Sequence, residues 1–198
     1  MKPSRLEAFS DGVFAVAITL LVFNLKVPEL ASGHLSKSLG NQWPSYLAYL
    51  ISFLSIGICW VNHHSILDRL AVADRELLFI NLALLLGIVS IPFTTSVAAI
   101  WYNQGSDARW AVGIYCANWV FVSATYMLLT HHLMGHEHLS SRATGVTLIS
   151  LQRKGYIGIC AYIIALIVSL LAPIIAFLIC LVLAIYYVFG VHQEESNI

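Results

Sequence analysis

The chain has 198 residues, of which 59% are hydrophobic and only 10% are charged. An ordinary soluble domain carries roughly 45–50% apolar and about 25% charged residues, so the composition indicates a membrane protein without a sizeable soluble domain. Ten Lys and Arg balance ten Asp and Glu, and no basic block stands out. This removes any composition argument for a nucleic-acid partner, and the expected partner is the lipid bilayer.

Six apolar segments are expected to cross the bilayer, because its core needs about 20 mostly apolar residues per spanning helix. Glu7 and Asp11 stand where a cleaved signal peptide is basic, so the first segment is expected to remain in the protein. The six segments are Phe9 to Val27, Trp43 to Leu67, Leu77 to Trp101, Trp110 to Leu133, Tyr156 to Ala172 and Pro173 to Val191. The predicted fold is an all-α membrane protein, with residues 1–198 forming one six-helix transmembrane domain.

The last two segments form one apolar run from Tyr156 to Val191. As a single helix it would be about 54 Å long, nearly twice the hydrocarbon thickness. Pro173 disfavours helical geometry at Ala172, so a tight hairpin of two short helices is predicted. For the same reason Pro28 is predicted to end the first helix, and Pro92 is predicted to kink the third.

Basic residues in alternate connections predict the orientation of the chain. With the N-terminus inside, seven Lys and Arg lie inside and three outside, which favours two cytoplasmic termini in a cell membrane. The inside set is Lys2, Arg5, Arg69, Arg75, Arg142, Arg153 and Lys154, and the outside set is Lys26, Lys37 and Arg109.

No cofactor, metal centre or enzymatic activity is expected. The sequence contains no GxSxG, no HExxH and no phosphate-binding glycine loop. The four cysteines lack CxxC spacing and are interpreted as small core residues. The stretch His131 to His138 is dense in possible zinc ligands, but Gly135 interrupts it, and adjacent histidines point about 100° apart. We therefore expect an exposed loop there, with pH sensing and metal binding both left open.

The first segment carries the strongest functional signal. Asp11 lies at the edge of the apolar span, next to Ser10. An ionisable group costs roughly 2.5–3.5 kcal/mol at the bilayer centre and less near an end, so it usually has a partner and a function. The simpler alternative is a carboxylate that caps the helix at the membrane interface.

Helix geometry separates this polar pair from an apolar stripe on the same segment. At 100° per residue the stripe is about 60° wide, with Thr19 on its flank, while Ser10 and Asp11 point away from it. The stripe consists of Val16, Leu20, Phe23 and Val27. It is available to meet symmetry copies of itself, although ordinary helix packing also explains such a stripe.

The run from Arg5 to Gly12, RLEAFSDG, matches the RxxxFSDG signature of the prokaryotic relatives of the endolysosomal potassium channel. The match extends through Leu21, and Trp60-Val61-Asn62-His63-His64 resembles the tryptophan and histidine cluster of this family. The chain thus resembles a family of six-helix channel subunits. The pore of this family lacks the usual potassium filter. Consistent with this resemblance, the chain contains no TVGYG sequence.

The resemblance implies a homotetramer that conducts potassium ions through a pore lined by four copies of the first helix. It implies an apolar constriction at Val16, Leu20 and Phe23, although the family often has Ile or Leu at the last position. Thr19 would contribute to potassium preference, while a Thr bonded to its own helix is the alternative. A polar network that holds the pore helix would comprise Arg5, Ser10, Asp11, Trp60, Asn62 and His63.

Two other functions remain open from the residues alone. A metal- or proton-coupled transporter could use Asp11, His63 and the histidines of the fourth segment. A membrane assembly protein with no transport role is the other alternative. Alternating-access transporters usually carry an inverted repeat with broken helices, and neither is evident in the sequence.

Overall fold

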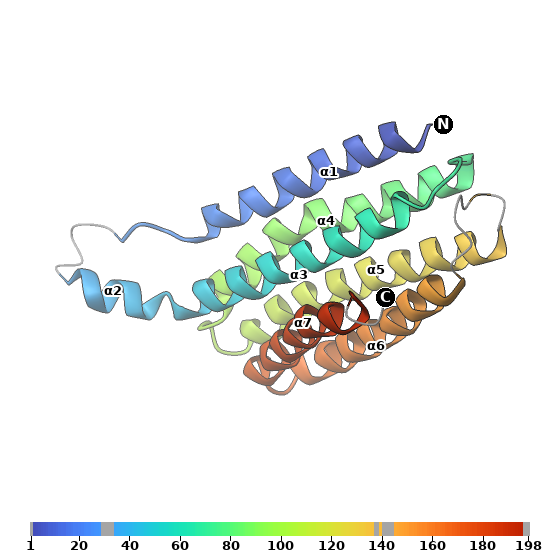
Figure 1. The fold of residues 1–198 in the computed structure, drawn as a ribbon. Helices are drawn as coiled ribbons and strands as arrows, with labels where there is room; N and C mark the ends of the chain where they lie inside the picture. Colours follow the sequence, from blue (N-terminus) through green and yellow to red (C-terminus); the bar gives the residue numbers. More distant parts are fainter. Residues whose placement is uncertain (1, 29–33, 137–138, 140–144, 196–198) are drawn as a thin grey trace.

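The computed structural model describes residues 2–28, 34–136, 139 and 145–195, and within these ranges the chain forms helices and no strand (Figure 1). The predicted all-α fold class is confirmed at this level. The elements are α1 (Pro3–Leu20), the 3-10 helix η1 (Leu21–Asn24), α2 (Leu35–Asn41), α3 (Trp43–Leu67), α4 (Arg75–Trp101), α5 (Asp107–Gly135), α6 (Gly145–Ser169) and α7 (Pro173–Glu195).

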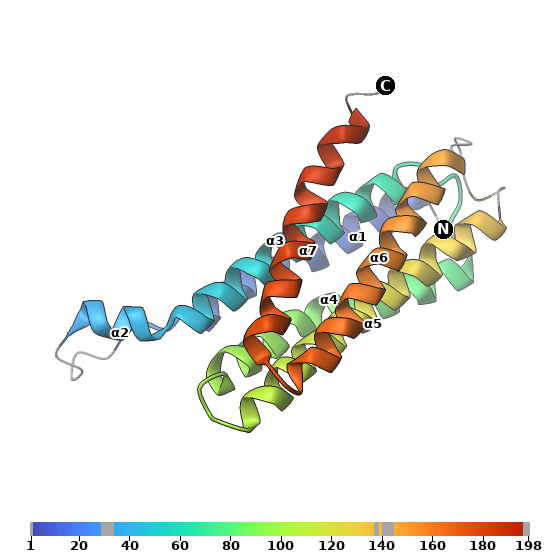
Figure 2. The same cartoon turned by 90° about the horizontal axis from the view of Figure 1, so that it is seen from below.

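Prolines begin three of these helices, where their missing N–H would have no helical partner in any case. Pro3 and Pro44 lie in the first turns of α1 and α3, and Pro173 is the first residue of α7. The chain turns between Ser169 and Pro173, so α6 and α7 pack against each other (Figure 2). Pro92 lies inside α4, which continues through it.

The structure differs most from the sequence prediction at three places. The α-helix of the first segment ends at Leu20 and continues only as η1, so Val27 is not helical. Pro28 accounts for this, because proline disfavours helical geometry at the residue before it. The short helix α2 was not predicted. The helix α6 begins at Gly145 rather than Tyr156, because its polar first turns do not show in an apolar pattern.

The first helix lies at the edge of the bundle. It packs against α3 and α4, while α5 packs against α4, α6 and α7 on the other side of the molecule (Figure 1). The helix α7 also contacts α3 and so closes that side. One flank of α1 is therefore left without a neighbour within the subunit.

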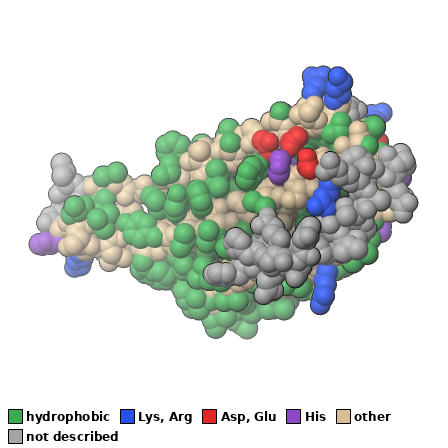
Figure 3. Space-filling model, in the orientation of Figure 1, with side chains coloured by type: hydrophobic (Ala, Val, Ile, Leu, Met, Phe, Trp, Pro, Cys, Tyr) green, Lys and Arg blue, Asp and Glu red, His purple; other side chains and the backbone are tan. Residues whose placement is uncertain are grey.

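The surface has the polarity expected of a protein in a bilayer. On the face drawn in Figure 3, hydrophobic side chains cover the middle of the elongated body, and most charged side chains gather toward its ends. Within the described part of the chain, five helical segments are long and apolar enough to span a membrane: Pro3–Asn24, Trp43–Leu67, Arg75–Trp101, Asp107–Gly135 and Leu151–Ser169. The apolar helix Pro173–Val188 is shorter.

Candidate functional site

The helix α1 has one buried face and one exposed face. Leu6, Ser10, Phe14 and Ala17 are buried against α3 and α4. The residues of the predicted apolar stripe are exposed instead: 55% of Val16, 42% of Leu20 and 76% of Phe23 is accessible. A large apolar surface on this edge is therefore free to contact another chain.

Thr19 lies beside this stripe and is also exposed. Its Oγ1 donates a hydrogen bond to the carbonyl of Val16 at 2.9 Å. A threonine bonded to its own helix was the alternative to a contribution to potassium preference, and the contact with Val16 is of that kind. It gives the hydroxyl proton an acceptor. The lone pairs of Oγ1 remain directed away from that bond, so the side chain can still act as an acceptor.

The 3-10 helix at the end of α1 determines where Phe23 lies. Side chains three residues apart are nearly aligned in 3-10 geometry, which keeps Phe23 close to the line of Leu20. The next polar residue, Asn24, donates from Nδ2 to the carbonyl of Pro92 in α4 at 3.4 Å. The end of the first segment is thereby attached to the middle of a neighbouring helix.

Two polar contacts join α1 to α3 near the N-terminal end of α1. The indole Nε1 of Trp60 donates to Oδ1 of Asp11 at 2.8 Å. One turn away, Nδ1 of His64 lies 3.0 Å from Oε1 of Glu7. The rings of Trp60 and His64 stack with centroids 6.0 Å apart. The carboxylate of Asp11 therefore has a defined partner on a neighbouring helix, as an acidic group at membrane depth requires.

A second polar chain crosses the buried interior and connects three helices. His63 on α3 bonds through Nε2 to Oδ1 of Asn81 on α4 at 2.7 Å. Asn81 in turn donates from Nδ2 to Oγ of Ser10 at 3.1 Å, and Ser10 donates to the carbonyl of Leu6 at 2.9 Å. The three side chains Ser10, His63 and Asn81 have no accessible surface. The imidazole of His63 is held through Nε2 alone, because its buried Nδ1 has no hydrogen-bond partner in the part of the chain that the structure describes. The bonds of this chain join three helices and so fix how α1, α3 and α4 fit together.

The predicted polar network differs from these contacts in three members. Asn81 was missed, although an amide in an apolar span was a usable signal. Asn62 lies instead in a cavity between α3, α5, α6 and α7, because two residues along a helix from Trp60 correspond to about 200° of rotation. Arg5 is exposed, and its guanidinium has no hydrogen bond or ion pair within the described ranges.

The expectation of an exposed loop from His131 to His138 holds only in part: His131 is exposed but lies in α5, and His136 is exposed and follows the end of that helix. His132 lies in α5 with 7% of its surface accessible, and its Nε2 is 3.0 Å from Oδ2 of Asp74. The Nδ1–H of His136 donates to the carbonyl of His132 at 2.9 Å. His138 lies outside the described residues. Among the described residues no group of three or more His, Cys, Asp or Glu side chains is arranged to hold a metal ion.

Apolar spanning helices, an internal polar chain and an exposed apolar edge define an all-helical, multi-pass membrane protein. A model of the family described as "Endosomal/lysosomal potassium channel TMEM175" matches residues 5–92. A potassium channel of Chamaesiphon minutus is 36% identical over 187 residues, which cover 92% of each chain. The chain belongs to the TMEM175 family.

Other relatives and a solved structure agree with this assignment. A potassium channel of Streptomyces collinus is 43% identical over 136 residues, 68% of this chain and 66% of that protein. The crystal structure of a lysosomal potassium-selective channel TMEM175 homolog from Chamaesiphon minutus superposes with a TM-score of 0.85 and 34% identity, covering 95% of this chain and 97% of the other. The endosomal/lysosomal proton channel TMEM175 of Homo sapiens is 29% identical, and the matched region covers 27% of its length.

Proposed function

We propose that this protein is a potassium-preferring cation channel whose pore is lined by four copies of α1. Relatives of nearly the same length are named potassium channels, and 92% of the Chamaesiphon minutus protein is covered. The single observation that carries the assignment of the pore to α1 is the exposed apolar stripe on the unpartnered edge of the subunit. No enzymatic activity is proposed.

Assembly is a consequence of this arrangement. One subunit contributes one copy of α1, and a single helix cannot enclose a path for ions. The exposed stripe is self-complementary in chemistry, so copies related by a rotation axis can bring their stripes together. We propose a homotetramer, the number that the family resemblance implies.

The constriction is proposed at Val16, Leu20 and Phe23. A narrow ring of apolar side chains hinders ions because it tends to lose its water and offers no ligand to replace the hydration shell. Thr19 is the hydroxyl beside this stripe and is proposed to contribute a polar ring that favours potassium. The contacts Asp11–Trp60 and Ser10–Asn81–His63 are proposed to hold α1 in position from behind.

Six spans per subunit are proposed, with α6 and α7 as a hairpin broken at Pro173 and both termini in the cytoplasm of a cell membrane. The orientation rests on the basic residues of the connections, and three exposed tryptophans support a membrane interface on one side. Trp43, Trp101 and Trp110 lie at the start of α3, the end of α4 and the start of α5, which is the proposed outer side, and tryptophan is enriched at membrane interfaces.

Reconstitution of the purified protein into planar bilayers tests the proposal. We expect unitary currents carried by potassium, with a reversal potential under opposing potassium and sodium solutions that shows a preference for potassium. Saturable flux that is coupled to protons and lacks unitary currents would favour the transporter alternative. Cross-linking in mild detergent is expected to give a ladder that ends at four subunits.

A further inference from the structure

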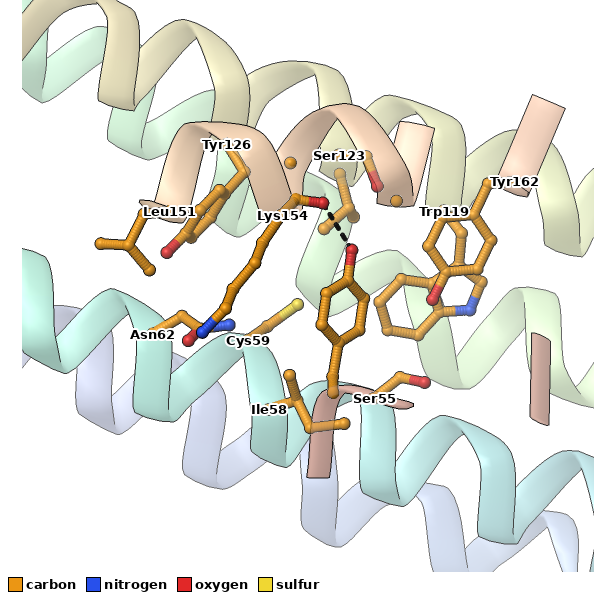
Figure 4. A pocket seen from close by; sticks show the side chains of 14 residues that line it. Ser55, Ile58, Cys59, Asn62, Trp119, Ser123, Tyr126, Leu151, Lys154 and Tyr162 are labelled. Carbon is orange, nitrogen blue, oxygen red and sulfur yellow. Dashed lines mark hydrogen bonds between the residues drawn. The ribbon is translucent and has the colours of Figure 1, made fainter. Parts of the chain in front are cut away.

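A small, partly open cavity lies among α3, α5, α6 and α7 (Figure 4). Its volume is about 60 Å³, in which about two to four water molecules fit. None of its lining residues comes from α1. The cavity is therefore separate from the proposed pore face, and its occupancy does not depend on the proposed function.

Three buried polar groups in the cavity wall have no hydrogen-bond partner among the described residues. They are the hydroxyl of Ser55 on α3 and, on α5, the indole N–H of Trp119 and the hydroxyl of Tyr126. Tyr162 lies near Ser55 and Tyr115 lies near Trp119, but neither pair has the geometry of a hydrogen bond. Only 4%, 1% and 9% of these residues is accessible, respectively. Native proteins rarely leave such groups unpaired, so three in one cavity point to a ligand that pairs with them.

The polar groups stand at both ends of the cavity. Figure 4 shows the side chain of Lys154 extending from α6 toward Asn62, with Tyr126 at the same end, while Trp119 and Ser55 lie at the other end. Ionisable residues within membrane proteins usually face polar partners or a water-filled space. The inward direction of Lys154 is consistent with a polar interior.

The wall that holds this space is built from close contacts. The Tyr187 hydroxyl donates to the carbonyl of Lys154 at 2.6 Å, which joins α7 to α6 beside the cavity. This contact needs a glycine at position 158, because a Cβ there would lie 2.7 Å from the Tyr187 oxygen. The helices are thus fixed around the space, so that Ser55, Trp119 and Tyr126 cannot simply collapse onto one another.

We propose that each subunit binds a small cluster of ordered water molecules in this cavity. Water both donates and accepts hydrogen bonds, whereas the Trp119 indole only donates and the two hydroxyls do either. An apolar occupant would leave all three groups unpaired. The bound water would add a link from α3 to α5 and α6, beside the direct hydrogen bond between Ser52 on α3 and Tyr115 on α5 at 3.1 Å.

The substitution Tyr126→Phe tests the proposal, because hydrated and dry cavities predict opposite changes in thermal stability. It removes one oxygen and leaves the ring in place. When water pairs with this hydroxyl, the substitution loses a hydrogen bond, and we expect the thermal midpoint of the detergent-solubilised protein to fall by about 2–4 °C. In a dry cavity the same change would remove an unpaired buried hydroxyl, and the midpoint would rise or stay unchanged. Either of these results overturns the proposal.

Two further variants show whether the change in the thermal midpoint comes from the cavity. Tyr186→Phe is the matched control, since Tyr186 lies on α7 with 48% of its surface accessible, and we expect it to leave the midpoint unchanged. Ser55→Ala tests the opposite end of the cavity and replaces Tyr126→Phe if that protein does not fold. A fall of the midpoint is expected for Ser55→Ala as well, and a rise would contradict hydration of that end.

Direct observation completes the test. A high-resolution structure of the wild-type protein is expected to show water density within about 3.2 Å of Nε1 of Trp119. Crystals grown in bromide distinguish water from a small anion held near Lys154, because bromide gives an anomalous signal. A bromide peak in the cavity, or a cavity without density, would overturn the assignment of water.

Discussion

Nε2 of His132, near the end of α5, lies 3.0 Å from Oδ2 of Asp74, the residue that caps the start of α4. The other carboxylate oxygen of Asp74 accepts the backbone N–H of Leu77 at 2.7 Å. One carboxylate thus caps a helix and pairs with a buried imidazole from the neighbouring helix. Two further titratable groups lie beside this pair: Glu76, with its Oε1 3.8 Å from Nδ1 of His132, and His136, whose ring centroid is 4.4 Å from that of His132.

The pair predicts acid sensitivity at this end of the bundle. Burial raises the pKa of the Asp74 carboxyl, but the Leu77 N–H and His132, with a smaller effect of His136, outweigh burial and lower the pKa below its ordinary value. The stability that Asp74 contributes is therefore present above the pKa of an unfolded Asp, about 3.9, and is lost as pH falls through the lower folded value.

Asp74→Asn measures this contribution, because Asn still caps a helix but carries no charge. We expect the wild type to be more stable than the variant at pH 5 and the difference to shrink by pH 3, as measured by thermal unfolding in detergent. Glu76→Gln is the control, since the Glu76 side chain is 72% exposed and its change should be small. A difference for Asp74→Asn that does not depend on pH would contradict the charge pairing.

The contact between Asp11 and Trp60 predicts an effect on assembly. Trp60→Phe removes the donor N–H and leaves the carboxylate of Asp11 without this partner, and Asp11→Ala leaves the indole unpaired. Trp60 is 41% exposed on the subunit, but its apolar surroundings offer no replacement partner for either group. We therefore expect a smaller fraction of the proposed tetramer in size-exclusion chromatography with light scattering for both variants. If Asp11→Ala assembles normally and loses only ion flux, Asp11 is a transport group rather than a structural one.

The proposed constriction predicts opposite effects for two positions on α1. Leu20→Asn or Leu20→Ala should widen and wet the narrow region, which raises potassium current and relaxes discrimination against sodium. Ile18 is partly buried against the core on another face of the helix, so Ile18→Asn should impair assembly instead. Currents identical to wild type from both Leu20 variants, in protein shown to be tetrameric, would remove Leu20 from the pore.

The close packing of α4 on α5 predicts that Gly87 cannot be enlarged. A Cβ at Gly87 would lie 2.7 Å from Cγ2 of Val122 and 3.0 Å from the Phe121 ring. The carbonyl of Gly87 also accepts from the Asn118 amide at 3.1 Å, so the backbones cannot separate freely. Gly87→Ala should destabilise the protein by about 1–3 kcal/mol in chemical denaturation. Val122→Ala in the same chain should restore part of the loss, and an absence of rescue would place the strain elsewhere.

Continuous apolar runs in the sequence predicted most of the helices. The contacts between particular residues of different helices could be predicted only in part. The second predicted segment, Trp43–Leu67, has the bounds of α3, because Pro44 and the polar residues after Leu67 mark its ends in the sequence. The start of α6 was missed, since its first turns include Arg153 and Lys154 and resemble a connection.

Which side chains meet between two helices depends on how each helix is rotated about its axis and on how deep each residue lies in the bundle. The sequence of one segment specifies neither. The structure brings Asp11 and Trp60 together, and their role in holding the pore helix stays a prediction. The pairing of His63 with Asn81 could not be read from either segment alone, because each residue is a single polar position in its own helix. For the same reason the burial of His132 depends on a partner, Asp74, that lies 58 positions earlier in the chain.

The change from α-helix to 3-10 helix after Leu20 also sets distances along the axis of the first segment. Four residues of α-helix from Val16 to Leu20 advance about 6 Å, and three residues from Leu20 to Phe23 advance about 6 Å when the rise is 2.0 Å each. The side chains of Val16, Leu20 and Phe23 therefore lie at three evenly spaced levels along the axis of the segment. In the proposed channel, an ion passing along this face would therefore meet three successive apolar levels about 6 Å apart rather than one.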